Sequence, residues 1–244
     1  MFDKLTSRLA EWFFSKPYYE RESLLNNYIR SQYGLFLTNE IYQKSESFYQ
    51  KVITESRPYI NKDAIVLDVG CTTGRMVFEY QKIGAQKVLG IDISNSFINF
   101  CKLVKNHKAN EVSFSVSDSE ISEFICGDII KYPLASGYFS FISCINVFDR
   151  VLNPAELVEK LYDLLAPEGI LLLSTPYDWK FSPAPYNLQV KDMKLVLKPG
   201  QWIIKKEIFD VPYTVPLNFN TDRKYKCHFL VLTKQANGVY LDNI

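Results

Sequence analysis

Short apolar runs alternate with amphipathic stretches along most of this chain, beginning near residue 64. The runs are rich in Val, Ile and Leu, which is typical of strands buried on both faces of a sheet. They predict strands at 65–69, 87–92, 123–126, 139–145 and 170–175, with helices at 74–83, 94–107 and 154–165 between them. Such alternation favours a parallel sheet joined by right-handed crossovers.

The first sixty residues have a helical pattern instead. Apolar residues recur at helical spacing at Phe2, Leu5, Leu9, Trp12 and Phe13. A second helix is expected to end at Gly34, and a third to cover 39–55 before Pro58. The apolar stripe of the first helix is typical of packing on the parent domain or over a pocket, and contact with a membrane surface is the alternative. We expect residues 1–60 to form a helical extension.

After the fifth predicted strand the pattern is less regular. Residues 190–197 are compatible with a helix, and 202–211 and 226–233 read as a strand pair. With these two strands the domain at 61–244 is predicted to be α/β. We expect a Rossmann-like, mostly parallel sheet of seven strands with helices on both faces, and an antiparallel last strand.

Composition narrows the class of protein. Hydrophobic residues make up 47% and charged residues 23% of the 244 positions, as in soluble globular proteins. A formal net charge of +1 does not favour nucleic acid as a partner. The five cysteines show no metal-ligand spacing and predict reduced thiols in a cytoplasmic protein. No apolar run or leader pattern predicts a membrane span or a signal peptide.

The most specific motif is the loop after the first predicted strand, which reads Val-Leu-Asp-Val-Gly-Cys-Thr-Thr-Gly-Arg at 66–75. A dinucleotide fingerprint needs a glycine where Thr72 stands. The loop resembles the first motif of class I S-adenosylmethionine (SAM) methyltransferases. The resemblance implies that Asp68 steers the ammonium group of SAM. It also implies that the backbone at Gly70, Cys71 and Gly74 approaches the methionine part.

Two further strand ends agree with that resemblance. Asp92 ends the second predicted strand, where a carboxylate accepts hydrogen bonds from both ribose hydroxyls. A strand-end Asp is often a helix cap instead, but Ser94 can cap the next helix and leave Asp92 free. At the end of the third strand the resemblance places the adenine, with Gly127 and Asp128 at its amine and Ile93 and Ile129 beside the ring.

The segment after the fourth predicted strand carries the candidate acceptor chemistry. Asn146-Val-Phe-Asp149-Arg150 resembles a segment of methyltransferases that act on histidine imidazoles, which include protein-histidine and ovothiol-type enzymes. The run Ser-Thr-Pro-Tyr177-Asp-Trp179 resembles a segment of the ovothiol group. Methyl transfer needs an aligned nucleophile and one managed proton. The resemblance implies that Asn146 positions an imidazole, that Asp149 bonds its second nitrogen, and that Tyr177 donates or stacks.

Further residues are candidates for acceptor binding: Tyr28, Tyr33, Arg150 and Trp179. Structural alternatives remain open for the catalytic set. Asn146 can bond backbone at a strand end, Asp149 and Arg150 can form an ion pair or cap a helix, and Tyr177 and Trp179 can simply pack. His107 and His228 have no evident carboxylate partner in the sequence and are expected to be structural.

The sequence therefore predicts a SAM-dependent methyltransferase whose cofactor is SAM and whose acceptor is a small molecule or a peptide. An imidazole nitrogen is the favoured acceptor atom. The alternatives are methylation of another nitrogen, an oxygen or a carbon, aminopropyl transfer, or a protein that binds SAM without turnover. No metal, nucleic acid or membrane partner is predicted, and the sequence does not indicate an oligomeric state.

Overall fold

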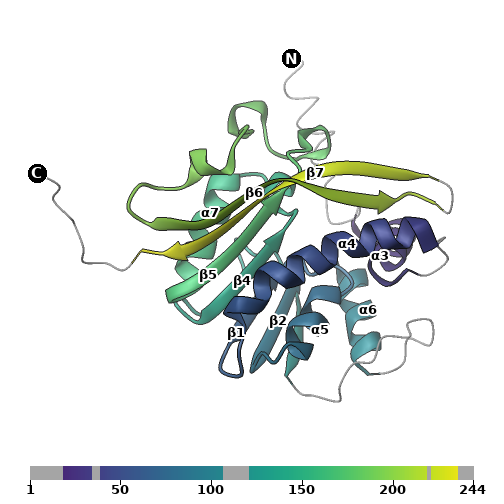
Figure 1. The fold of residues 1–244 in the computed structure, drawn as a ribbon, viewed down its shortest axis with the longest axis horizontal. Coiled ribbons are helices and arrows are strands. Elements are labelled where there is room, and N and C mark those ends of the chain that lie inside the picture. Colours follow the sequence, from purple (N-terminus) through teal and green to yellow (C-terminus); the bar gives the residue numbers. More distant parts are fainter. Residues whose placement is uncertain (1–18, 35–38, 107–120, 219–220, 236–244) are drawn as a thin grey trace, which may run out of the picture.

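The computed structural model describes residues 19–34, 39–106, 121–218 and 221–235 (Figure 1). Its helices are α3 (Glu22–Tyr33), α4 (Asn39–Ser56), α5 (Arg75–Lys82), α6 (Asn95–Lys105) and α7 (Pro154–Leu164). Its strands are β1 (Ile65–Val69), β2 (Lys87–Asp92), β3 (Ser122–Cys126), β4 (Phe139–Ile145), β5 (Leu165–Thr175), β6 (Trp202–Pro216) and β7 (Asp222–Lys234). Short 3-10 turns join the later elements.

The strands form one seven-stranded sheet in the order β3-β2-β1-β4-β5-β7-β6. Strands β1 to β5 pair in parallel, while β7 is antiparallel to both of its neighbours. The predicted α/β fold with a mostly parallel sheet is confirmed. The strand order reverses direction beside β1, because β2 lies on one side of β1 and β4 on the other. Ligands of such sheets bind at this switch point.

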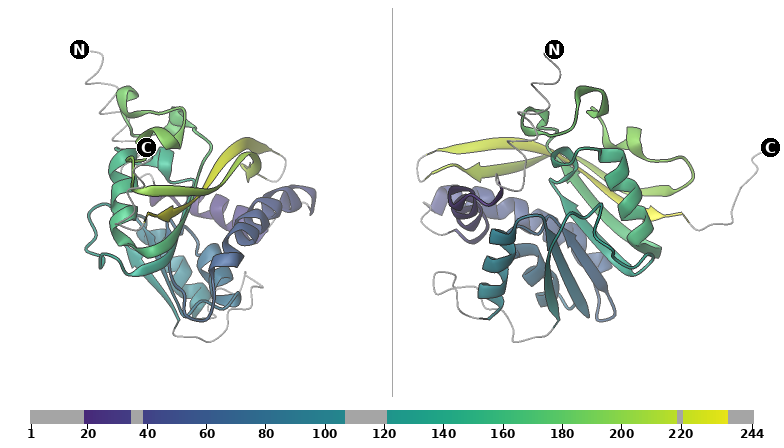
Figure 2. Two further views of the ribbon diagram at one scale, coloured as in Figure 1. Left: turned by 60° about the vertical axis from the view of Figure 1, so that its left-hand side comes forward. Right: turned by 180° about the vertical axis from the view of Figure 1, so that it is seen from behind.

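Successive residues of each buried strand point to opposite faces of the sheet, which divides the core into two layers. Val66 packs with side chains of α4, α5 and α6, whereas Leu67 packs with those of α7. Figures 1 and 2 show the sheet between these helices. Because both layers are apolar, the strands read as continuous hydrophobic runs, which is how they were predicted.

The hairpin of β6 and β7 is longer than the sequence predicted. Strand β6 continues to Pro216 rather than 211, and β7 begins at Asp222 rather than 226. The additional residues of the hairpin lie beyond the segment of β7 that pairs with β5, because that pairing ends at His228. Strand β6 also packs against α3 and α4 (Figure 1). The hairpin therefore brings residues near the chain's end to the carboxyl edge of the sheet.

Other expectations need adjustment. The helix predicted at 190–197 is only a 3-10 turn at Met193–Val196, because its first residues are extended. Strand β5 begins at Leu165, before the predicted 170, with an irregularity in its pairing to β4. All five cysteines are free thiols. The apolar stripe at 2–13 and His107 lie outside the described residues, and within them no helix is long and apolar enough to cross a bilayer.

Candidate active site

A cavity of about 1100 Å³, here called the first cavity, opens at the carboxyl ends of β1 to β4. All the predicted cofactor residues except Gly74 line it: Asp68, Gly70, Cys71, Asp92, Ile93, Gly127, Asp128, Ile129 and Asn146. They come from four strand ends that are far apart in the sequence. Convergence of polar groups in a concave site is the usual mark of a ligand pocket.

The loop between β1 and α5 needs glycine at two positions. Gly70 has φ +69°, and a Cβ there would lie 2.3 Å from Cγ2 of Val147. Gly74 has φ +84° and precedes the first residue of α5. A Cβ at Gly74 would be 3.0 Å from Sγ of Cys101, so it shapes the loop from behind rather than lining the cavity. Both glycines allow a left-handed backbone that other residues adopt at a cost.

Asp68 is buried at the floor of the first cavity. Its Oδ1 accepts a hydrogen bond from the Ser143 hydroxyl at 2.5 Å. Burial is the main cause that raises the pKa of Asp68 to about 7; the hydrogen bond from Ser143 opposes this shift, and the neighbouring charge of Asp92 adds to it. A buried carboxyl of this kind is strongly stabilised by a cation placed beside it.

Asp92 is also buried. The sequence predicted a free carboxylate, but both of its oxygens already accept hydrogen bonds. Its Oδ2 accepts from the backbone N–H of Thr72 and its Oδ1 from that of Ser94, both at 2.9 Å. Burial raises the pKa of Asp92 to about 6, although these two bonds lower it. Ser94 does cap α6, as expected, by accepting from the Phe97 N–H. Each carboxylate oxygen keeps a second lone pair for a ligand hydroxyl.

The part of the cavity at the ends of β2 and β3 is lined by one acid among apolar residues. Asp128 stands between Gly127 and Ile129 after β3, and Ile93 follows β2. One oxygen of Asp128 accepts from the Ile130 N–H at 3.0 Å, which fixes the side chain in its turn. This arrangement suits a purine ring held between aliphatic side chains.

A second cavity, of about 1120 Å³, adjoins the first. Five residues line both: Tyr19, Tyr28, Asn146, Arg150 and Tyr213. The second cavity is otherwise lined by α3 and by the extended β6–β7 hairpin, which provides Arg223 and Tyr225. Of the predicted acceptor residues, Tyr28 and Arg150 line this cavity.

Asn146 lies where the two cavities meet. Its backbone is left-handed, with φ +57°, which Asn tolerates better than most residues. Its Oδ1 accepts from the Ser174 hydroxyl at 2.9 Å, and its N–H donates to the Ser174 carbonyl at 3.0 Å. The end of β5 thus holds Asn146 in this strained turn.

Asp149 faces away from both cavities. Its side chain is fully buried, and Oδ2 accepts from the Asp178 N–H at 2.7 Å and lies 3.6 Å from Nη1 of Arg150. Its Oδ1 has no hydrogen-bond partner within the described part of the chain. Burial raises the pKa of Asp149, and the guanidinium of Arg150 opposes that shift. Asp149 is placed to orient Arg150 rather than to touch a ligand.

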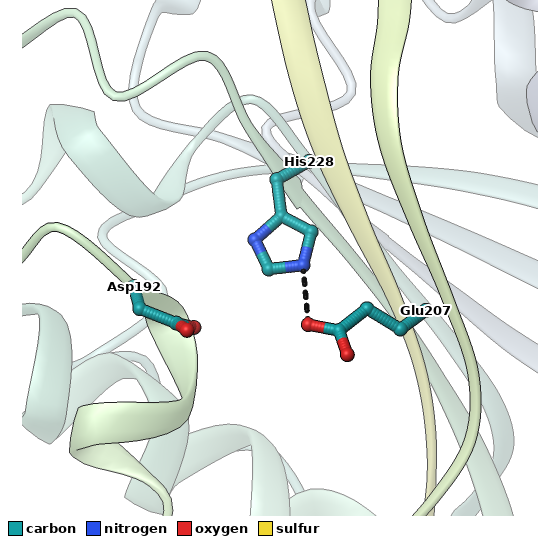
Figure 3. Close-up of side chains that lie close together, drawn as sticks. All are labelled: Asp192, Glu207 and His228. Atoms are coloured by element: carbon teal, nitrogen blue, oxygen red, sulfur yellow. Dashed lines mark hydrogen bonds and ion pairs between the residues drawn. The ribbon is translucent and has the colours of Figure 1, made fainter.

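Tyr177 is directed to the other side of the hairpin, contrary to its predicted contact with the acceptor. Its hydroxyl accepts from the Met193 N–H at 2.9 Å and lies 2.7 Å from Nδ1 of His228. His228 was expected to lack a carboxylate partner, but its Nε2 lies 3.0 Å from Oε1 of Glu207 (Figure 3). The sequence missed this pair because β6 and β7 had first to be aligned.

The same cluster includes Asp192, whose carboxylate comes close enough to His228 and Glu207 to hold a metal ion in principle (Figure 3). The ammonium of Lys194 pairs with two of these three groups. It lies 2.7 Å from Oε1 of Glu207 and 3.5 Å from Oδ2 of Asp192. The cluster is therefore an ion-pair network that secures the turn after β5.

Two predicted acceptor residues lie outside both cavities. The Tyr33 hydroxyl donates to the Thr73 carbonyl at 2.7 Å and supports the glycine loop. Trp179 donates from Nε1 to the Val190 carbonyl and packs on Phe148. The sequence did not predict Tyr19, Tyr213, Arg223 and Tyr225 as lining residues. Most of these belong to the hairpin, whose position depends on long-range packing.

The comparisons agree with this geometry. A family model described as a methyltransferase domain matches residues 42–207. The chain belongs to the methyltransferase domain family. It has the class I fold of SAM-dependent enzymes, and SAM is its cofactor. The floor of the first cavity fits that cofactor, since the buried carboxyls of Asp68 and Asp92 are groups that can bind an ammonium and hydroxyls.

Individual relatives of this methyltransferase domain are distant. A carboxy-S-adenosyl-L-methionine synthase of Nitratiruptor is 26% identical over 78% of this chain and 80% of its own length. A ubiquinone biosynthesis O-methyltransferase of Actinobacillus pleuropneumoniae is 25% identical over 57% of this chain and 53% of its own. The chain spans about half the length of several curated relatives that it matches.

Among solved structures, a magnesium protoporphyrin IX methyltransferase of Synechocystis with bound SAM has the same fold. Its TM-score is 0.60 at 16% identity, and the match covers 94% of this chain and 96% of that one. At this identity the likeness shows the fold alone.

Asp92→Ala is expected to weaken SAM binding by about 1–3 kcal/mol, because two ligand hydroxyls lose a charged acceptor. Calorimetry should show affinity reduced roughly 5- to 150-fold. Asp63→Ala, which removes an exposed acid before β1, is the control and should bind SAM normally. Near-normal affinity of Asp92→Ala would refute the ribose assignment.

Proposed function

We propose that this methyltransferase domain transfers the methyl group of SAM to a small molecule bound in the second cavity. The observation that carries the proposal is the shared wall of Tyr28, Asn146 and Arg150, because it makes a ligand in one cavity adjacent to a ligand in the other. Displacement at a sulfonium needs a nucleophile in line with the methyl carbon, and adjacent cavities supply that alignment.

The lining of the second cavity favours a nitrogen acceptor. Within the described residues it includes no Asp, Glu, His or Lys. Burial raises the pKa of the Tyr28, Tyr213 and Tyr225 hydroxyls, so these remain protonated. A site without a general base suits a nucleophile that attacks as a neutral group and loses its proton afterwards. The imidazole nitrogen proposed from the sequence has this property.

Of the three residues predicted to be catalytic, only Asn146 lines the cavities, and we assign it to contact with the acceptor. We propose that Asp149 and Tyr177 act indirectly. Asp149 orients Arg150, and Tyr177 anchors the turn that carries Asp178. We propose the extension at 1–60 as a cover of the site, since its helix α3 supplies Tyr28. A cytoplasmic location remains a prediction.

Methyl incorporation tests this function. With methyl-labelled SAM, the protein should label an imidazole in a panel of imidazoles, phenols and thiols. Asn146→Gly keeps the left-handed backbone but removes the side chain, and it should lower the rate roughly 10- to 100-fold, or about 1.4–2.7 kcal/mol in the barrier. Its affinity for SAM should change far less.

The outcomes separate the alternatives. SAM binding without label in any acceptor would indicate a protein that binds SAM without turnover. Label in phenols or thiols alone would reject the nitrogen acceptor but keep methyl transfer. Equal losses of rate and SAM affinity in Asn146→Gly would move its role to the cofactor.

A further inference from the structure

Two guanidinium groups face the second cavity. Arg150 follows β4 and lies at the junction with the first cavity, while Arg223 lies near the start of β7. They approach from elements more than seventy positions apart in the sequence, which places two cations on one ligand-sized space. No carboxylate lines that space within the part of the chain that the structure describes.

A continuous hydrogen-bonded chain holds these two groups together. Nη2 of Arg150 lies 3.5 Å from Oδ2 of Asp178, and the same oxygen accepts from the Tyr225 hydroxyl at 3.0 Å. Nη1 of Arg223 donates to the Tyr225 hydroxyl at 3.3 Å. Nη1 of Arg150 also donates to the Asp178 carbonyl at 2.8 Å. These bonds link both guanidiniums through Tyr225 and Asp178.

The two acids that pair with Arg150 do not line the cavity. Asp149 is fully buried, and Asp178 has a side chain only 16% exposed and does not line the cavity. A ligand in the cavity therefore meets guanidinium N–H groups, with the carboxylates farther away. A guanidinium presents its N–H donors in a planar fork that matches the geometry of a carboxylate or a phosphate.

Much of the remaining lining is apolar or aromatic. The apolar residues are Leu24, Pro176, Val215 and Leu217, the aromatic residues include Tyr28 and Tyr213, which also line the first cavity, and Asn27 and Ser31 are polar. A ligand that fills this space has a hydrophobic body and an acidic end.

We infer that the acceptor is an anionic small molecule, an organic carboxylate or phosphate monoester with an apolar body, whose acid group is bound by Arg150 and Arg223. This inference rests on the proposed function, since it takes the second cavity as the acceptor site. Methyl transfer to such a molecule leaves the acid group unchanged: the nucleophilic nitrogen forms the new bond to the methyl carbon, the sulfonium bond breaks to a neutral thioether, and the methylated nitrogen then releases its proton to solvent. The acid group contributes binding and orientation.

Binding of simple probes tests the inference without turnover. The protein is saturated with S-adenosylhomocysteine, and benzoate, phenyl phosphate and benzamide are titrated by calorimetry. At least one acid should bind tenfold or more tightly than benzamide, which has the same ring without the charge. Whether benzoate or phenyl phosphate binds more tightly identifies the acid.

Variants of Arg223 locate the effect. Arg223→Gln should weaken binding of the acid at least fivefold and leave benzamide unchanged, and Arg223→Lys should lie between. Lys224→Gln removes a neighbouring exposed charge that does not line the cavity and is the matched control. Unchanged melting temperature and S-adenosylhomocysteine affinity show that Arg223→Gln is folded.

Two results would overturn the inference: failure of both acids to bind more tightly than benzamide, or an undiminished preference for acid in Arg223→Gln. Failure of the proposed function gives a different result, because acids would still bind through Arg223 while no acceptor became labelled.

Discussion

Replacement of Gly70 by Ala is expected to abolish measurable SAM binding. At φ +69° an alanine has a strain of about 1–2 kcal/mol. Its Cβ would also lie 2.3 Å from Cγ2 of Val147, too close for any relaxed contact, so the loop or Val147 has to move into the first cavity. We expect SAM affinity to fall by more than about 100-fold, which corresponds to a loss of more than roughly 2.7 kcal/mol in binding free energy.

Gly137 offers a matched control for the backbone strain alone. It has φ +64°, and a Cβ there meets nothing within 4 Å. Gly137→Ala should lower the melting temperature by a few degrees and leave SAM affinity unchanged. Val147→Ala combined with Gly70→Ala should restore part of the binding, because it removes the clashing methyl groups. If Gly70→Ala binds SAM as well as Gly137→Ala does, close approach of the loop is not required.

The cofactor side of the site was predictable because local patterns encode it. Each buried strand of a parallel sheet appears in the sequence as an apolar run, and the carboxyl ends of such strands meet at one edge. Asp68, Asp92 and Asp128 therefore had to come together once their strands were recognised, and they do so in the first cavity. The backbone bonds to Asp92 were missed because they depend on how the glycine loop folds back over β2.

The acceptor side was less predictable because it depends on long-range packing. Tyr213 and Tyr225 are partners across the β6–β7 hairpin, in a part of it that the sequence did not predict as strand. Their approach to Tyr28 depends on the packing of β6 against α3, which no local pattern shows. Tyr177 and Trp179 are only a few residues past β5, yet the turn at Tyr177, with φ +54°, directs both away from the cavities.

SAM affinity is expected to rise with pH through Asp68. Burial raises the pKa of this carboxyl to about 7, so in the ligand-free protein it is mostly protonated at pH 6 and mostly ionised at pH 8. The ammonium group of SAM binds the ionised form, and affinity should follow the ionised fraction, increasing up to about tenfold per pH unit below 7. The α-amino group of SAM itself loses a proton near pH 8, so calorimetry should cover about pH 5.5–7.5.

Asp68→Asn should flatten this dependence above about pH 6, which is near the raised pKa of Asp92, and should weaken binding at pH 7.5. In the ligand-free protein, Asp68 should make stability depend on pH with the sign opposite to that of SAM affinity. Because the folded pKa of Asp68 exceeds the unfolded value of 3.8, its stabilising contribution is complete below that value and is lost as pH rises through about 7. Asp68→Asn has no such loss, so its melting temperature relative to the unmodified protein should increase between pH 4.5 and 7.5. If the difference in melting temperature between the two proteins stays constant over this range, Asp68 is ionised throughout. Groups besides the Ser143 hydroxyl would then have to stabilise its buried charge in the ligand-free protein.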